Sequence, residues 1–433
     1  MTSHSDYASV AVQDPGMALC LSGGGFRATM FHLGAVRRLN ELGVLSQLST
    51  ITSVSGGSIL NGILATRWAQ LRLGNDGIFV NFDEVVANQI TGFCRKDLRT
   101  PLLLGIRLSP ANWGVLIRDW FSVSANFLAA AYDPLYRQKL GDLPAPGPDN
   151  PRFVFCATNV RTGACWHFHG GPNARMGDFY TGYCDAIQVP ISYAVAASSA
   201  FPPGFSALRL KIPKGHPFTR VDPWGEVRVM SPKRGNQPHS DPRMPALLTD
   251  GGVYDNLGVE PVWQRYKTIL VSDAGRPFES VRESGQAVIP RLKRVIDIGM
   301  EQVAAVRKRW LVEEFVNSRR VGALWSLHTL LEDFPLADRQ GYGSTARILL
   351  NKVRTDLNAF SEGEMACLEN HGYSLADAAI RSRAKSLCPN PTSPFRWPHS
   401  KWSTDTMAVG VLDGSDRRNL WRDLFRYITG RSS

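Results

Sequence analysis

Three short segments of the chain carry residue types that could take part in nucleophilic or acid–base chemistry. The first is Ser53-Val54-Ser55-Gly56-Gly57, which stands between an expected strand and an expected helix. A serine at such a tight turn is exposed as a nucleophile, and small neighbours let the strand and helix approach closely. The usual pattern has glycine two residues before the serine, where this chain has Ser53. The motif alone therefore also fits an ordinary small-residue turn.

A glycine run, Gly23-Gly24-Gly25, precedes Phe26 and Arg27 at the end of an earlier expected strand. Backbone N–H groups in such a run can converge on one point, and a helix N-terminus adds positive partial charge. This nest can hold a phosphate or a developing oxyanion, although a plain tight turn would use the same residues. Dinucleotide binding is a competing interpretation. Ala28 stands where G-x-G-x-x-G has its last glycine, and the loop has no P-loop lysine.

The third segment is Asp250-Gly251-Gly252, directly after the expected strand 246–249. An acidic residue at the carboxyl end of a strand lies where open α/β sheets place their sites. A carboxylate is a weak base for an alcohol unless it is desolvated and held against the hydroxyl. By itself, Asp-Gly-Gly also fits a turn. We interpret His32, His167 and His169 as structural residues, not as the base.

These segments need secondary-structure elements that bring them together. Short apolar runs rich in β-branched residues predict strands, and one-turn spacing of apolar residues predicts a helix over 27–42. Because such strands alternate with helices, the sequence predicts an α/β fold with a mostly parallel central sheet and helices on both faces. The expected strands are 18–22, 50–54, 153–157, 246–249 and 268–271.

The composition of the 433 residues is that of a globular protein, with 43% hydrophobic and 20% charged residues. A formal charge of +11 favours an anionic partner, either a phospholipid surface or nucleic acid, although many basic proteins have no such partner. The seven cysteines form no C-x-x-C pair and the N-terminus lacks a secretory signal, so we expect a reduced, cytoplasmic protein. No apolar run is long enough to predict a membrane span.

Together, the three segments resemble the patatin-like phospholipase family over residues 17–275. The glycine loop matches the family's G-G-G-x-R, Ser55 matches its serine elbow, and Asp250 begins its D-G-[GA] motif, all in the family's order. Residues 157–163 and 196–205 are also similar to the family. The resemblance implies a three-layer patatin-like core with a helical insertion at about 67–150 and a basic insertion at about 206–245. Residues 276–433 would then be a mainly helical extension packed on this core.

The resemblance also implies a lipid acyl hydrolase that cleaves phospholipids or other glycerolipids through a Ser55–Asp250 dyad and an acyl-enzyme. It places the oxyanion hole at the amides of the loop Gly23-Gly24-Gly25, with Gly56 as a further donor. Arg27 would brace this loop or pair with a substrate phosphate. We expect peripheral membrane contact but no cofactor, metal or nucleic acid, and a regulatory partner is left open. The alternative is a catalytically silent lipid-binding or nucleotide-binding protein.

Other features have both a functional and a structural interpretation. A group of aromatic residues could line an acyl channel, touch a membrane or pack in the core. A basic, amphipathic helix expected at 416–428 could dock on an anionic surface or pack on its own domain. Basic side chains of the 206–245 insertion are expected near the mouth of the site. The aromatic residues are Trp113, Trp120, Phe121, Phe127 and Tyr132, and the basic residues include Lys211, Lys214, Lys233 and Arg234.

Overall fold

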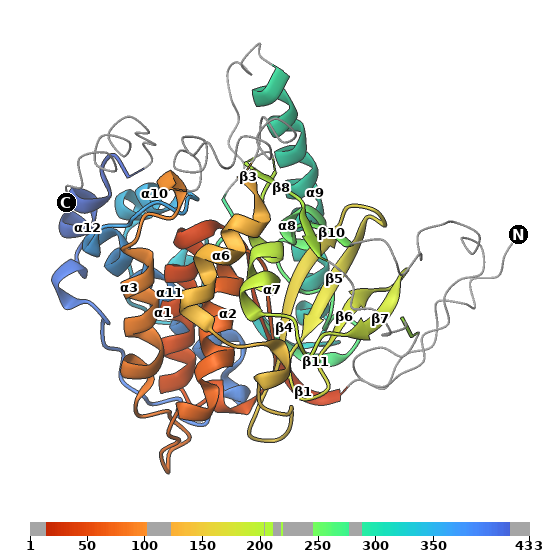
Figure 1. The fold of residues 1–433 in the computed structure, drawn as a ribbon. Helices are drawn as coiled ribbons and strands as arrows, with labels where there is room; N and C mark the ends of the chain where they lie inside the picture. The colour runs from red at the N-terminus through yellow and green to blue at the C-terminus, as the bar shows by residue number, and fades with distance from the viewer. Residues whose placement is uncertain are drawn as a thin grey trace, which may run out of the picture.

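The computed structural model describes residues 14–101, 123–202, 204–210, 218–219, 246–276 and 288–415. Within these residues, helices lie on both sides of a large mixed sheet (Figure 1). The strands are β1 (Asp14–Leu21), β2 (Leu48–Ser53), β3 (Val123–Ser124), β4 (Arg152–Asn159), β5 (Ala164–His169), β6 (Arg175–Asp178), β7 (Gly182–Asp185), β8 (Phe205–Ser206), β9 (Leu208–Leu210), β10 (Ala246–Asp250), β11 (Tyr266–Asp273) and β12 (Val321–Ser326). The longer helices are α1 (Gly25–Glu41), α2 (Gly56–Arg67), α3 (Asn88–Cys94), α6 (Ala125–Tyr136), α7 (Ile191–Ser199), α9 (Val288–Val316), α10 (Ser344–Lys352), α11 (Glu362–Arg383) and α12 (Asp405–Leu412), and α8 (Gly252–Asp255) is a single turn.

The sheet has the strand order β12-β11-β1-β2-β4-β5-β6-β7, and β10 joins β4 to β9. Its centre, from β12 to β4, is parallel. Beyond β4 the chain turns back on itself, so β5, β6 and β7 form an antiparallel edge. The predicted α/β class, with a mostly parallel central sheet and helices around it, is confirmed.

Successive side chains of β1 point into two different hydrophobic cores, one on each face of the sheet. Leu19 and Leu21 point into the larger core, which also contains apolar residues of α1, α2 and α11. Ala18 and Cys20 point to the opposite face, where they pack with Leu311 of α9. Successive side chains of a strand point to opposite faces, so one strand serves both layers. This gives the three layers, with α1 and α2 on one side of the sheet and α9 on the other (Figure 1).

The residues that follow the predicted core take part in the same framework. They contribute β12 to the sheet, beside β11, as well as the helices α9 to α12. Helix α11 lies directly against α1: a Cβ at Gly34 would be 1.9 Å from the Glu369 carbonyl oxygen, and one at Gly372 would be 1.8 Å from the Phe31 carbonyl oxygen. Glycine is needed at both crossing points because the two backbones touch.

Several sequence-based expectations fall outside the part of the chain that the structure describes. These are Trp113, Trp120 and Phe121, the basic residues Lys211, Lys214, Lys233 and Arg234, and the helix at 416–428. Of the two remaining aromatic residues, Tyr132 is fully buried in the larger core and Phe127 packs against that core. Among the described helices, none is both long and apolar enough to cross a bilayer.

Candidate active site

Ser55 occupies a strained turn between β2 and α2. Its φ of 50° lies in the left-handed region, which residues with a side chain rarely adopt. Its amide donates to both the carbonyl oxygen and the Oγ of Ser198, at 3.1 Å and 2.9 Å. These two bonds hold the turn in place, and Ser55 stands at the N-terminus of α2. The positive end of the helix dipole therefore lies beside the serine hydroxyl.

Ser53 takes part in a buried polar network behind the turn. Its hydroxyl donates to the Val154 carbonyl oxygen at 3.2 Å. It also accepts hydrogen bonds from Ser58 Oγ and Asn61 Nδ2, each at 2.9 Å. The elbow thus tolerates serine in place of the usual glycine, because the extra hydroxyl is fully hydrogen-bonded among its neighbours.

Asp250 is the carboxylate that the structure brings to Ser55. The Ser55 side chain lies close enough to the Asp250 carboxylate to lower its pKa, and one Asp250 oxygen accepts from the Gly252 amide at 2.7 Å. Asp250 is only 2% exposed. Burial raises the pKa of Asp250 to about 7, although Gly252 and Ser55 both oppose the rise. A carboxylate with this pKa is a far better proton acceptor near neutral pH than an ordinary aspartate.

Strand direction explains how two residues so far apart in sequence meet. β2 runs parallel to the first half of β4 and ends with Ser53 opposite Phe155. β10 runs antiparallel to the second half of β4 and ends with Asp250 opposite Ala157. The two strands therefore run toward each other along the same side of β4, and their ends are two residues apart, or about 7 Å, along that strand.

This arrangement corrects one step of the sequence-based argument. Asp250 was expected at the carboxyl edge of a parallel sheet, together with Ser55. It does end its strand, but both neighbours of β10, which are β4 and β9, are antiparallel to it. The local sequence predicts that 246–249 is a strand, but not which way the strand runs, because direction depends on pairing with distant residues.

The glycine-rich loop lies against the N-terminus of α2. Gly24 and Gly25 have φ values of 142° and 58°. A Cβ at Gly56 would be 2.1 Å from the Gly25 carbonyl oxygen, so the loop and the serine turn are in backbone contact. Within the described residues, the amides of Gly24, Gly25 and Gly56 have no hydrogen-bond acceptor. These three N–H groups are therefore available to a ligand beside Ser55.

Gly23 has a different role from the other glycines of the loop. Its amide donates to the Asn256 carbonyl oxygen at 3.1 Å, so this N–H group is already occupied. A Cβ at this position would lie 3.1 Å from the Ser55 Cβ and 2.4 Å from Asn256 Oδ1. Gly23 thus gives Ser55 room, and its inclusion among the amide donors is not supported by the hydrogen bonding.

Arg27 is fully buried under the loop. It donates to the carbonyl oxygens of Ala274 at 2.7 Å, Val353 at 3.1 Å and Asn351 at 3.4 Å. Burial lowers the pKa of Arg27 to about 9. Of the two roles expected for Arg27, these contacts support bracing of the loop, because the guanidinium is directed at backbone carbonyls and is not exposed to a substrate phosphate.

The glycine loop is also supported by the backbone at Asp356, which no sequence pattern marked as part of the site. The Phe26 amide donates to the Asp356 carbonyl oxygen at 3.1 Å, and a Cβ at Gly25 would be 3.0 Å from the same oxygen. Asp356 also forms an ion pair with Arg99, at 2.5 Å. No local pattern marks Asp356, because its contribution is a backbone carbonyl that any residue type could supply.

Ser198 lies in the 196–205 stretch that was expected to line the site. Besides the Ser55 amide, its carbonyl oxygen accepts from the Gly251 amide at 3.2 Å. The Asp250 amide donates to the Ala200 carbonyl oxygen at 3.1 Å. The end of α7 thus joins the serine turn and the aspartate turn.

The sequence raised His32, His167 and His169 as possible bases, and the structure describes where each of them lies. His32 is fully buried, with Nδ1 2.8 Å from Ser272 Oγ and Nε2 2.9 Å from the Ser22 carbonyl oxygen. Burial lowers the pKa of His32 to about 4. His167 and His169 are buried in β5. Asp250 is the titratable side chain whose pKa is affected by Ser55.

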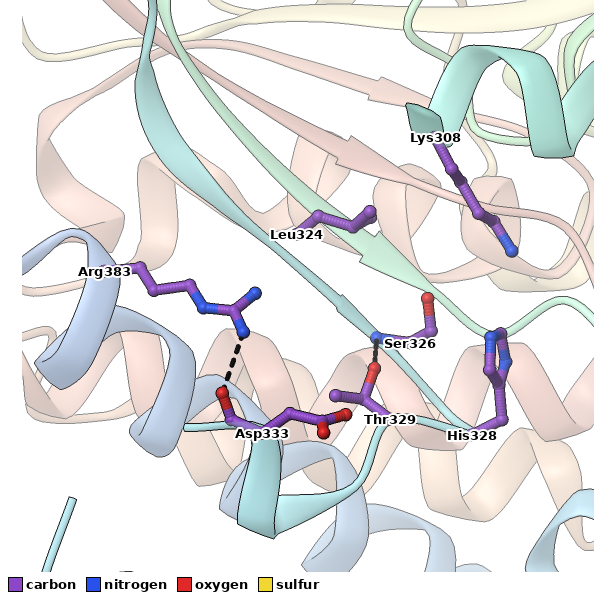
Figure 2. A pocket seen from close by; sticks show the side chains of 7 residues that line it. All are labelled: Lys308, Leu324, Ser326, His328, Thr329, Asp333 and Arg383. Atoms are coloured by element: carbon purple, nitrogen blue, oxygen red, sulfur yellow. Dashed lines mark hydrogen bonds between the residues drawn. The ribbon is translucent and has the colours of Figure 1, made fainter. Parts of the chain in front are cut away.

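A separate polar pocket, of about 510 Å³, lies at the end of β12 (Figure 2). Its two cations already have partners: Lys308 pairs with Asp273 at 2.6 Å, and Arg383 donates to the Asp333 carbonyl oxygen at 3.0 Å. Ser55 and Asp250 are not among its lining residues. In the described part of the chain, no group of histidine, cysteine, aspartate and glutamate side chains is arranged to hold a metal ion.

Fold and site together define an α/β protein with a serine at a strained turn, a buried aspartate beside it, and a glycine loop with free amides. The family model of the patatin-like phospholipases matches residues 19–263, which is more than half of the chain. The chain belongs to this family. A search of curated protein sequences found no match.

Similar solved structures include human GIVD cytosolic phospholipase A2, with 13% identity and a TM-score of 0.45 over 88% of this chain. The same human enzyme in complex with methyl gamma-linolenyl fluorophosphonate gives 14% identity, a TM-score of 0.46 and 88% coverage. VipD from Legionella pneumophila gives 16% identity and a TM-score of 0.33 over 86% of this chain and 68% of its own. The chain covers 60% and 59% of the length of the human enzyme in these two structures.

Proposed function

We propose that this protein hydrolyses acyl ester bonds of phospholipids or other glycerolipids, with Ser55 as nucleophile and Asp250 as base. The observation that carries the proposal is the convergence of β2 and β10, which brings the buried Asp250 carboxylate, with a pKa of about 7, beside the Ser55 side chain. Asp250 accepts the hydroxyl proton as Ser55 attacks the ester carbonyl, and it gives this proton to the leaving alcohol as the acyl-enzyme forms. It then takes a proton from the water that attacks the acyl-enzyme and returns it to Ser55 as the carboxylic acid departs.

The oxyanion of the tetrahedral intermediate is assigned to the free amides of Gly24, Gly25 and Gly56. Donors that are fixed before the reaction stabilise the charge that develops on the carbonyl oxygen, and loss of one such donor commonly lowers kcat by about 10²–10³. The backbone contact between Gly25 and Gly56 supports this assignment, because it brings the loop and the serine turn to the same place. The N-terminus of α2 adds to the positive potential.

The lipid class of the substrate is supported by membership of the patatin-like phospholipase family. The formal charge of +11 fits a protein that works at an anionic lipid surface. The cytoplasmic setting expected from the scattered cysteines also fits, since all seven are unpaired and buried.

The test uses Ser55→Ala and Asp250→Asn, with the surface substitution Ser403→Ala as a matched control. We expect a fluorophosphonate probe to label the wild type and Ser403→Ala, but not Ser55→Ala. Ester hydrolysis should be lost in Ser55→Ala and should fall about 10²–10⁴-fold in Asp250→Asn. Digestion of mixed lipids by the wild type, with the products identified by mass spectrometry, would define the headgroup and acyl position. Labelling of another serine, with activity retained in Ser55→Ala, would refute the assignment.

A further inference from the structure

Helix α9 is anchored on one side by buried and ion-paired residues. Arg307 pairs with Glu260 at 2.7 Å and lies 3.6 Å from Asp255, and Lys308 pairs with Asp273 at 2.6 Å. Leu311 is fully buried against the sheet. These contacts fix the C-terminal half of the helix to the body of the protein.

The other end of α9 exposes large apolar side chains. Leu292 is 54% exposed, Val295 is 64% exposed and Ile298 is 43% exposed. The three residues are spaced three apart, so they fall on one side of the helix, within an arc of about 120°. We call residues 291–300 the α9 tip. A tip with three large apolar side chains facing outward is typical of a surface that binds something apolar.

The α9 tip lies beside the candidate active site. Met300 contacts the aspartate turn, since its Cε would be 3.2 Å from a Cβ at Gly252. Leu292 is eight residues before Met300, which places it about 12 Å further along the helix. Figure 1 shows this end of α9 extending beyond the sheet, at the end of the molecule where β10 and α8 lie. The exposed apolar side chains thus project from the side of the protein that holds Asp250.

The charge of this segment distinguishes among possible partners. Residues 288–300 contain three basic residues, Arg291, Lys293 and Arg294, and one acidic residue, Asp297. Arg291 is exposed. A second copy of the same tip would bring like charges together, whereas anionic lipid headgroups would attract them. Apolar residues that insert between lipids, together with basic residues at headgroup level, are the features of an interfacial helix.

We propose that the α9 tip inserts its apolar side into the surface of a phospholipid bilayer that contains anionic lipids. The insertion holds the Ser55–Asp250 site against the surface from which substrate enters. This inference rests on the proposed function for its biological meaning. Adsorption itself needs no turnover, so it is measured with the Ser55→Ala protein.

The experiment compares three proteins in the Ser55→Ala background, using vesicles of phosphatidylcholine with a minority of phosphatidylglycerol. The first has no further change. The second carries Leu292→Asp, Val295→Asp and Ile298→Asp. The third is a matched control with Leu73→Asp and Val80→Asp, whose wild-type side chains are 57% and 67% exposed.

The control residues lie at the opposite end of α1 from the glycine loop. Leu73 and Val80 belong to a loop that contacts the residues directly after α1. In this contact, Ser46 Oγ donates to the Gly77 carbonyl oxygen at 2.8 Å. Helix α1 has 17 residues, which separates its two ends by about 25 Å. The control therefore replaces two exposed apolar residues with aspartate far from the site.

We expect the triple substitution to weaken vesicle binding about tenfold or more, because each change removes an inserted side chain and adds negative charge. The Leu73 and Val80 control should bind like the parent. In the catalytically active background, the triple variant should hydrolyse a soluble monomeric ester at the wild-type rate, which also shows that it is folded. If the proposed function fails, this soluble activity is absent from every variant, and the binding result still stands.

A second measurement does not depend on the triple variant. All seven native cysteines are buried, so a cysteine introduced at position 292 or 73 can be labelled selectively with a polarity-sensitive fluorophore. The label at Leu292→Cys should shift to shorter wavelength when vesicles are added, and the label at Leu73→Cys should not. The proposal is overturned if both labels respond alike or neither responds. It is equally overturned if the triple variant changes the oligomeric state in solution while it still binds vesicles normally.

Discussion

Replacement of Asp250 by asparagine should stabilise the fold while it lowers the activity. Burial raises the pKa of Asp250 from 3.8 to about 7. The folded protein therefore holds this proton more tightly than the unfolded chain does. The contribution of the Asp250 proton to the free energy of unfolding is fully present below about pH 4 and is lost as the pH rises toward 7. A shift of roughly 3 units, at about 1.36 kcal/mol for each unit, corresponds to about 4 kcal/mol above pH 7.

Asparagine avoids this penalty because it carries no charge. Its side-chain oxygen can still accept from the Gly252 amide, so the turn is retained. Urea unfolding of both proteins at about pH 4 and about pH 8 measures the effect. We expect the two to differ little at the lower pH and the variant to be more stable, by up to about 4 kcal/mol, at the higher pH. A pH-independent difference, or a variant that is less stable at about pH 8, would refute this reasoning.

Asp273 is a matched control for this experiment, since it is another buried aspartate at the end of a strand. Burial alone would raise its pKa, but the Lys308 ammonium, which is 2.6 Å away, lowers the pKa of Asp273 well below its ordinary value. Its contribution to stability is therefore present above that ordinary value and is lost as pH falls. Asp273→Asn should destabilise the protein at about pH 8 because it leaves the half-buried Lys308 ammonium without this partner.

Three further outcomes are expected from the same geometry. Hydrolysis of a soluble ester should rise about tenfold for each pH unit and level off above about pH 7, where Asp250 is ionised; a flat profile through that range would contradict its role as base. Gly56→Ala should lower kcat by about 10²–10³, measured with the same ester, because the new Cβ would be 2.1 Å from the Gly25 carbonyl oxygen. Ser53→Gly should cost about 1–3 kcal/mol in urea unfolding, because it removes a buried hydroxyl that accepts from Ser58 Oγ and Asn61 Nδ2, and it should leave most of the activity.

Much of the framework could be predicted from local sequence patterns. The apolar run at 18–22 and the β-branched run at 50–54 became β1 and β2, and the one-turn periodicity over 27–42 became α1. These signals are local, because a buried strand or an amphipathic helix shows its environment in its own residues. The order of the three motifs along the chain then pointed to the family that the comparison identified.

Features that depend on distant pairing could not be predicted in this way. The 246–249 run predicted a strand, but nothing in it shows that β10 runs antiparallel to β4. Gly23 looks identical to Gly24 in the sequence, yet only the Gly23 amide is taken up by the Asn256 carbonyl oxygen. These differences arise from partners that lie about ninety or more residues away in the sequence.

The frame of the site extends well beyond the residues that match the family. The match ends at residue 263, but Arg27 donates to carbonyl oxygens at Ala274, Asn351 and Val353. A buried guanidinium without acceptors is strongly unfavourable, so these later residues are part of what keeps Arg27 beneath the glycine loop. The Phe26 amide likewise needs the Asp356 carbonyl oxygen. The conformation of the loop beside Ser55 therefore depends on backbone carbonyl groups between residues 274 and 356, although its motif occupies only five residues.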